Sequence, residues 1–351
     1  MEFIVALVIT FMATLVITPF VIKFAIKVGA VDKPNNRKVH TKLMPRLGGL
    51  AIYSGFLIGV LAFFPDVLKY WPVLVGGLII VITGIIDDMK ELSAKMKLGG
   101  QLLAALITVL GGIKIEFITL PAGNIVEFGY FAIPLTILWI VAITNAINLI
   151  DGLDGLAAGV SSIVLLTFSG LAISMGNPTV ALLGFMMLGS TLGFLKYNFN
   201  PAKIFMGDTG SLFLGYMISS LAVMGLFKNV AVFSLIVPII ILGVPILDTT
   251  FAIIRRIINK KPISAPDKFH LHHCLINLGF SHRQTVIMIY AMSAIFSIAA
   301  IVFTKATIWG ATITLIGLLI LIELVVEVTG LISHKYRPLL SLMDGQKQET
   351  K

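Results

Sequence analysis

Long apolar stretches, separated by short polar segments, run along almost the whole chain. Hydrophobic residues make up 58% of the sequence and charged residues only 12%, which is too few charges for the surface of a soluble globular protein. The hydrocarbon core of a bilayer is about 30 Å thick, and a helix of about 20 apolar residues crosses it. Membrane β-barrels instead alternate apolar and polar residues. The pattern therefore predicts an all-α integral membrane protein.

A window of about 19 residues divides the chain into about eleven predicted membrane spans. The first carries Glu2, but no basic segment precedes it and no small-residue cleavage site follows it, so we interpret it as a retained span. No separate soluble domain interrupts the series, and residues 1–351 are interpreted as a single polytopic domain. The predicted spans are 3–24, 48–65, 71–87, 98–113, 131–149, 157–175, 178–195, 209–227, 230–254, 285–304 and 307–330.

The distribution of lysine and arginine predicts the orientation. Of the 26 basic residues, 22 fall in the segments 23–46, 88–97, 196–203, 255–283 and 331–351. By the positive-inside rule these segments are cytoplasmic, with the N-terminus outside and the C-terminus inside. The net charge of +9 is explained by this topology and by attraction to anionic lipid, so no nucleic-acid partner is expected.

The segment from Ile113 to Tyr130 is the one predicted departure from helix. Its residues alternate between apolar and polar before a turn with the sequence Pro121-Ala122-Gly123-Asn124. Such a pattern is typical of a β-hairpin, which we expect on the extracytoplasmic membrane surface.

The predicted orientation places every polar cluster on the cytoplasmic face, in the loops 25–47, 87–97, 148–156, 196–208 and 255–283. In one of these clusters, Asp87-Asp88 ends the third span. Two adjacent carboxylates at a helix end can simply mark the membrane interface. Alternatively, one binds a cation and the other accepts a proton, because their mutual repulsion separates their pKa values. Lys97 and its basic neighbours could bind phosphate.

The fifth span runs into Asn145-Ala-Ile-Asn148-Leu-Ile-Asp151-Gly-Leu-Asp154-Gly155. The polar residues recur every third position, so a helical continuation would align Asn148, Asp151 and Asp154 along one side. Loops rich in Asx and Gly are often simple turns. Amides inside an apolar run, however, are costly and indicate function.

The eighth span opens with Gly207-Asp208-Thr209-Gly210-Ser211. One interpretation is a simple helix start with Asp208 or Thr209 as N-cap. The other is that Asp208 binds magnesium while backbone N–H groups at the helix N-terminus face a phosphate. The segment lacks the Walker A pattern, so a nucleoside triphosphatase is not expected.

The longest cytoplasmic loop contains His270-Leu-His272-His273 beside the only cysteine, Cys274. A single cysteine excludes an intramolecular disulfide, and the histidine spacing matches none of the usual zinc pairings. A zinc site and a solvated loop stay as alternatives. The interpretation we favour is a set of donors for an anionic phosphate ligand, formed with the cations Arg255, Arg256, Lys260, Lys261 and Lys268.

Together these motifs resemble the bacterial polyprenyl-phosphate N-acetylhexosamine-1-phosphate transferases of glycosyltransferase family 4. The resemblance extends over nearly the whole chain in order. It is carried by Asp32-x-Pro34-x-x-Arg37-Lys38-x-His40, Pro45-Arg46-x-Gly48-Gly49, Asp87-Asp88, Asn145-x-x-Asn148-x-x-Asp151-Gly-x-x-Gly155-Leu, Gly207-Asp208-x-Gly-Ser-Leu and Asp267-Lys-x-His270-Leu-His272-His273. Within the superfamily, the His-Leu-His-His form with an eleventh span resembles enzymes that use UDP-N-acetylglucosamine (UDP-GlcNAc), and differs from those that transfer phospho-N-acetylmuramoyl-pentapeptide.

The resemblance implies transfer of GlcNAc-1-phosphate from UDP-GlcNAc to undecaprenyl phosphate, with release of UMP, at the cytoplasmic side of a bacterial membrane. This is the first membrane step of a cell-envelope glycan such as teichoic acid or O-antigen. Another UDP-N-acetylhexosamine is an alternative donor, Mg²⁺ is the expected cofactor with Mn²⁺ as an alternative, and a homodimer is compatible with the family. A secondary transporter, suggested by Asp248, Glu323 and Glu327, is disfavoured because transporter acids should lie at the midplane.

The resemblance also implies roles for individual residues. Asn148 and Asp208 are expected to bind the metal, and Asp87 to orient or deprotonate the lipid phosphate with support from Asp88. Asp151 and Asp154 are expected at the uridine or ribose. The catalytic set is completed by His272 and His273, and the remaining substrate-binding set is Asn145, Lys97, Arg255, Arg256 and His270.

Overall fold

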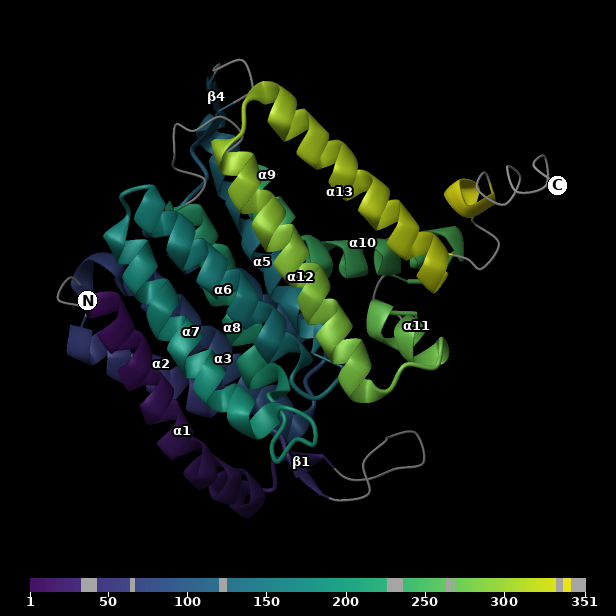
Figure 1. Cartoon of the computed structure of the whole chain (residues 1–351). Coiled ribbons are helices and arrows are strands. Elements are labelled where there is room, and N and C mark those ends of the chain that lie inside the picture. The colour runs from purple at the N-terminus through teal and green to yellow at the C-terminus, as the bar shows by residue number, and fades with distance from the viewer. Residues whose placement is uncertain are drawn as a thin grey trace.

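The computed structural model describes residues 1–32, 43–63, 67–119, 125–225, 236–262, 267, 269–332 and 337–341, which are mostly helical (Figure 1). The helices are α1 (Glu2–Val28), α2 (Gly48–Phe63), α3 (Trp71–Lys90), α4 (Ala94–Leu110), α5 (Ala132–Ile150), α6 (Leu156–Ser174), α7 (Pro178–Asn198), α8 (Gly207–Gly225), α9 (Ile236–Ile241), α10 (Gly243–Ile258), α11 (Leu271–Asn277), α12 (His282–Lys305) and α13 (Ile308–Thr329). The strands are β1 (Val31–Asp32), β2 (Met44–Pro45), β3 (Phe117–Thr119) and β4 (Ile125–Glu127), and short 3-10 turns cover Val67–Tyr70 and Gly129–Phe131.

Seven helical segments in the described part of the chain are long and apolar enough to cross a membrane, which confirms a helical membrane protein. They are Glu2–Val28, Trp71–Lys90, Gly129–Ile150, Leu156–Ser174, Pro178–Asn198, His282–Lys305 and Ile308–Thr329. Helix α2 is apolar but shorter, and α4 and α8 occupy the fourth and eighth predicted spans.

The ninth predicted span, 230–254, is interrupted. Among its described residues, α9 ends at Ile241 and α10 begins at Gly243, and α10 runs across the direction of α12 in Figure 1. Pro245 lacks the N–H that would continue a helical ladder back to Ile241. A hydropathy window averages over such a break, because Gly243 and Pro245 hardly lower the mean of an otherwise apolar segment.

The predicted hairpin is confirmed. Strands β3 and β4 pair antiparallel, with Phe117 opposite Glu127, while the predicted turn at 120–124 lies outside the described residues. A second, unpredicted two-stranded ladder joins β1 to β2 and pairs Val31 with Pro45. This ladder holds the segment that leads into α2 beside the end of α1.

Helix α8 lies at the centre of the bundle. Every residue from Thr209 to Gly225 is buried, and α8 packs against α2, α3, α5, α6 and α7. Its first turn therefore sits where several other helices end. Outside this centre, α1 packs closely along α7, where a Cβ at Gly189 would come within 2.2 Å of the Thr10 hydroxyl, as is usual where small residues line membrane helices.

Candidate active site

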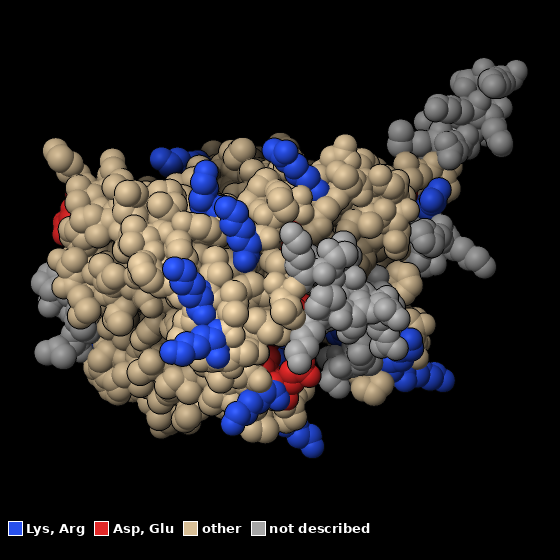
Figure 2. Space-filling model, turned by 90° about the horizontal axis from the view of Figure 1, so that it is seen from below, with Lys and Arg blue, Asp and Glu red and all other residues tan. Residues whose placement is uncertain are grey.

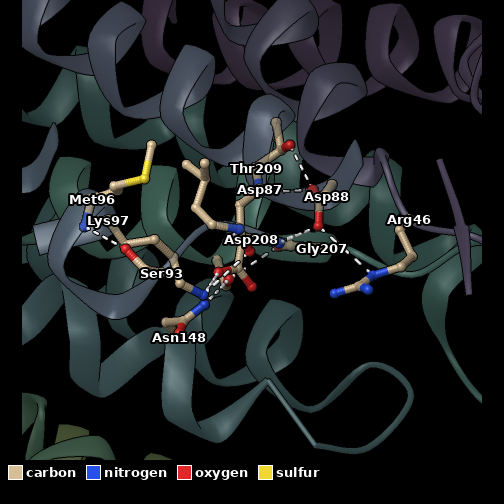
Figure 3. A network of polar contacts seen from close by, with 12 residues as sticks. Arg46, Asp87, Asp88, Ser93, Met96, Lys97, Asn148, Gly207, Asp208 and Thr209 are labelled. Atoms are coloured by element: carbon tan, nitrogen blue, oxygen red, sulfur yellow. Dashed lines mark hydrogen bonds and ion pairs between the residues drawn. The ribbon is translucent and has the colours of Figure 1, made fainter. Parts of the chain in front are cut away.

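The N-terminus of α8 is capped by a carboxylate from another helix. Asp88, near the end of α3, accepts hydrogen bonds from the backbone N–H of Asp208 at 2.9 Å and of Thr209 at 3.0 Å, and from the Thr209 hydroxyl at 2.7 Å (Figure 3). A negative group at this position is favoured by the helix dipole and by the otherwise unpaired N–H groups. These two N–H groups, which we expected to face a phosphate, are thus occupied by Asp88.

Glycines make this capping contact possible. A Cβ at Gly84, one turn before Asp88, would lie 2.4 Å from the Cα of Thr209, and one at Gly49 would lie 2.0 Å from the Gly210 nitrogen. Only glycine lets α2 and α3 approach the start of α8 so closely. The glycines of the sequence motifs therefore permit contacts between helices.

The second carboxylate of the pair faces a lysine. The Asp87 Oδ2 atom lies 3.2 Å from the Lys97 ammonium, whose nitrogen is also 2.8 Å from Oδ2 of Asp208. The other Asp87 oxygen accepts from the backbone N–H of Leu92 at 2.7 Å. Lys97 thus joins carboxylates that are far apart in the sequence, as predicted from their shared face.

Oxygen ligands for a cation converge at the same place. One carboxylate oxygen from each of Asp87, Asp88 and Asp208 lies within 4.8 Å of the others. The amide of Asn148, at the end of α5, donates to the Ser211 hydroxyl at 2.8 Å beside this cluster (Figure 3). An all-oxygen set dominated by carboxylates fits a hard divalent cation.

Arg46 is a site residue beyond the candidates predicted from the sequence. Its Nε lies 3.8 Å from Asp88 Oδ1 and its Nη1 lies 3.9 Å from Asp32. The backbone around it is fixed by Gly48, whose N–H donates to the Phe205 carbonyl just before α8. The Pro45-Arg46-x-Gly48-Gly49 motif was the available signal. The motif residues Pro34, Arg37, Lys38 and His40 lie outside the described residues.

The loop after α5 joins the carboxylate cluster to the histidine loop. Burial, followed by the charges of Asp208 and Asp88, raises the pKa of Asp151 to about 8. Asp154 instead binds the segment between α7 and α8, because its Oδ2 accepts from the Ala202 N–H at 3.1 Å and from the Asn200 side-chain amide at 3.0 Å.

Helix α10 anchors the histidine loop through Asp248. Its carboxylate lies 2.8 Å from His270 Nδ1 and accepts from the Leu271 N–H at 2.7 Å. The ring of His272 packs against Gly152, where a Cβ would lie 2.3 Å from its Nε2. The predicted proximity of these two motifs is therefore present in the structure.

The histidine rings lie side by side. The His272 and His273 centroids are 4.2 Å apart, and burial, followed by the neighbouring His273, lowers the pKa of His272 to about 3. A neutral imidazole donates through one N–H only. Among the described residues, the group of side chains arranged to hold a metal is the aspartate cluster and not this histidine group, so the zinc alternative gains no support.

The two arginines at the end of α10 are buried. Arg255 donates from Nη2 to Asp267 at 2.6 Å and from Nη1 to the Leu331 carbonyl at 2.7 Å. Although burial opposes it, the Arg255 guanidinium lowers the pKa of Asp267. For Arg256, Nε is buried with no hydrogen-bond partner among the described residues, and Lys268 lies outside them.

The remaining candidate, Asn145, pairs with a neighbouring helix. Its side-chain amide donates to Gln101 Oε1 of α4 at 2.6 Å and to the Val141 carbonyl at 2.8 Å. Of the acids that suggested transport, Asp248 binds the histidine loop, and Glu327, which is fully buried, accepts from the backbone N–H groups of Leu339 and Leu340.

Comparisons with known proteins find similarity along most of the chain. The model of glycosyl transferase family 4 matches residues 70–226. The chain is 54% identical to a probable undecaprenyl-phosphate N-acetylglucosaminyl 1-phosphate transferase of Bacillus subtilis, over 95% of this chain and 94% of that protein. It is 37% identical to a decaprenyl-phosphate N-acetylglucosaminephosphotransferase of Mycolicibacterium smegmatis, over 93% and 87%. A phospho-N-acetylmuramoyl-pentapeptide-transferase of Halalkalibacterium halodurans is 35% identical, over 84% and 95%.

Proposed function

The chain belongs to glycosyl transferase family 4, and we propose that it transfers N-acetylglucosamine 1-phosphate from UDP-GlcNAc to undecaprenyl phosphate, releasing UMP. An oxygen of the lipid phosphate forms a bond to the β-phosphorus, and the bond from that phosphorus to the oxygen bridging to the α-phosphate breaks. UMP leaves with that bridging oxygen. Catalysis of such a transfer depends mainly on positioning and on electrostatic stabilisation of the phosphates.

The observation that carries the proposal is the cluster of Asp87, Asp88, Asp208 and Lys97 at the meeting point of α3, α4 and α8. Three acids and an ammonium at the end of apolar helices are costly unless they serve a charged ligand. The Bacillus subtilis relative, 54% identical, is named for transfer to a polyprenyl phosphate.

We assign Mg²⁺ to this cluster, with Asp208 and Asn148 as its main ligands and Mn²⁺ as an alternative ion. The donor set fits, because it offers carboxylate and amide oxygens. When bound, the ion supplies positive charge to the diphosphate of the donor. We assign to Lys97, which lies against the Asp87 and Asp208 carboxylates, the binding of a substrate phosphate, and to Asp87 the orientation of the lipid phosphate.

The uridine half of the donor is assigned to the loop after α5, where Asp151 adjoins the cluster. The sugar and its phosphate are assigned to His272 and His273, beside Gly152 on the same loop. Arg256 supplies a buried cation at the end of α10, while His270 and Arg255 keep their partners Asp248 and Asp267. This arrangement extends the donor from the carboxylate cluster to α11.

The site is proposed to face the cytoplasm, in a fold with about eleven membrane segments and an outside N-terminus. Seen from the end of the bundle at which β1 and α11 lie, Lys and Arg side chains are spread over the surface and acidic side chains gather among them (Figure 2). A basic cytoplasmic face of this kind suits a soluble nucleotide sugar meeting a lipid acceptor. A homodimer is compatible with this arrangement.

The experiment that tests the proposal presents the purified protein with undecaprenyl phosphate, MgCl₂ and a panel of UDP-sugars. Mass spectrometry of the lipid fraction identifies the product, and UMP release measures turnover. We expect undecaprenyl-diphospho-GlcNAc as the main product. If the product carries another N-acetylhexosamine, the proposed reaction stands and only the donor is different. If none of the UDP-sugars gives a lipid-linked sugar, the proposal is refuted.

A further inference from the structure

A pair of side-chain amides joins α4 to α5 close to the carboxylate cluster. The Gln101 amide donates to Asn145 Oδ1 at 3.3 Å, and the Asn145 amide donates to Gln101 Oε1 at 2.6 Å. Gln101 is only 3% exposed. The second Asn145 hydrogen goes to the carbonyl of Val141 on its own helix. Each amide is therefore satisfied by protein groups.

Each member of this pair shares a helix face with a residue of the site. Lys97 precedes Gln101 by four positions in α4, and Asn148 follows Asn145 by three positions in α5. Residues three or four apart lie above one another on a helix. The amide pair therefore lies one turn from Lys97 and one turn from Asn148.

The covalent connection between the two helices does not fix their separation at this end. Helix α4 ends at Leu110 and α5 begins at Ala132, so the connecting hairpin lies at the far ends of both helices. From Gln101 to the end of α4 is about 14 Å at the usual helical rise. The amide pair is a direct side-chain contact between α4 and α5 near the cluster.

We propose that Gln101 and Asn145 are a positioning pair, which holds Lys97 of α4 and Asn148 of α5 at the separation that the carboxylate cluster requires. Loss of the Asn145 amide leaves the Gln101 amide, which is only 3% exposed, without its partner, and this costs free energy. Loss of the Gln101 amide removes the same contact between the helices, so either change lets α4 and α5 move apart. The sequence interpretation of Asn145 as a substrate-binding residue is thereby replaced. This inference rests on the proposed transferase function where turnover is the readout.

The test compares four variants of the full-length protein in detergent. Gln101→Met and Asn145→Leu each replace one amide by an apolar side chain of similar shape. The exchanged double variant Gln101→Asn/Asn145→Gln keeps both amides and the summed side-chain length. Thr108→Val is the matched control, because the Thr108 hydroxyl, two turns further along α4, makes a buried 2.6 Å hydrogen bond to Tyr216 of α8.

We expect each single amide variant to lower kcat at least about tenfold, as misplaced catalytic groups do, with KM for UDP-GlcNAc within a factor of about three. The exchanged variant should recover most of kcat, and Thr108→Val should keep it. A purely structural amide pair would lower melting temperature without this recovery. The rise in melting temperature on adding MgCl₂ is a second readout without turnover, and should follow the same order.

The proposal is overturned if both single variants keep the kcat and the magnesium-induced rise in melting temperature of the wild type. It is also overturned if the exchanged variant has a kcat no higher than that of the single variants, or if Thr108→Val loses as much kcat as they do. Absence of transfer by the wild type would instead refute the proposed function. In that case the magnesium-induced shift in the same variants still decides whether the amide pair positions the cluster.

Discussion

At the scale of single residues, two adjacent aspartates have different surroundings. Both oxygens of Asp88 are taken up by the first turn of α8, whereas Asp87 faces Lys97 and, through it, Asp208. Asp88 thus holds the backbone of Asp208 in place, while the Asp208 carboxylate is bound by Lys97. Replacement of these two adjacent aspartates should therefore have different effects on activity and stability.

Replacing Asp208 and replacing Asp88 should separate chemistry from structure. Asp208→Asn is expected to reduce turnover by about a hundredfold or more with little change in melting temperature, because the charge that offsets a cation is lost. Asp88→Ala should also reduce turnover, and should lower stability by about 1–2 kcal/mol through loss of the helix cap. UMP release and thermal unfolding of the purified variants measure both effects. Full activity of Asp208→Asn, or of the wild type in excess EDTA, would contradict the assignment.

His272 should give the protein a specific pH dependence of stability. Its folded pKa is about 3, against about 6.5 for an unfolded histidine, so the unfolded chain binds more protons between these values. Stability contributed by the neutral ring is therefore present above pH 6.5 and decreases as the pH falls toward 3. Melting temperatures at pH 7.5 and 5.5 should differ less in His272→Leu than in the wild type. Equal pH slopes would show that this ring is not kept neutral.

At the scale of elements, α10 acts as a support for the histidine loop. Asp248 and Arg255 are two turns apart on its buried face. Asp248 binds His270 and the backbone of Leu271, and Arg255 binds Asp267. The loop is thus attached to α10 at two points, Asp267 and the start of α11. Because His272 and His273 follow directly, their positions depend on α10.

Asp248→Ala should therefore affect the donor more than the acceptor. With its anchor removed, the loop that carries His272 and His273 is displaced, and KM for UDP-GlcNAc is expected to rise about tenfold or more, while KM for undecaprenyl phosphate changes little. Asp248→Asn should recover part of the loss, since its carbonyl oxygen can still accept from the Leu271 N–H. Steady-state kinetics with each substrate varied in turn measure the split. An equal rise in both KM values would argue for general loosening of the fold.

Hydropathy and motifs predicted the helical membrane fold, the hairpin and the convergence of the aspartates. They did not predict the break before α10, because a window average is insensitive to Pro245, nor the cap that Asp88 provides to α8. The cap joins Asp88 to residues 120 and 121 positions later in the chain. A contact over this separation has no signature in the local sequence. Gln101 belongs to the same class, since only the packing of α4 against α5 gives it a partner.

At the scale of the whole molecule, the carboxylate cluster and the hairpin lie at opposite ends of the bundle. Asp87, Asp88 and Asp208 adjoin the end at which β1 lies, whereas Figure 1 places β4 at the other end. A membrane in which these helices are embedded therefore separates the two ends. The basic residues around the cluster support our proposal that its end faces the cytoplasm.

This sidedness can be measured with single cysteines. In a Cys274→Ala background, which removes the one native thiol, Lys95→Cys places a thiol on an exposed position beside the cluster, and Tyr130→Cys places one beside the hairpin, where Tyr130 is 94% exposed. A membrane-impermeant maleimide should label Tyr130→Cys in intact bacteria and label Lys95→Cys only after permeabilisation. Because UDP-sugars are soluble and charged and do not cross the bilayer, a transferase whose Lys95→Cys reacts from outside could not reach its donor. That result would overturn both the orientation and the proposed donor, whereas the expected pattern places the catalytic cluster on the side where nucleotide sugars are made.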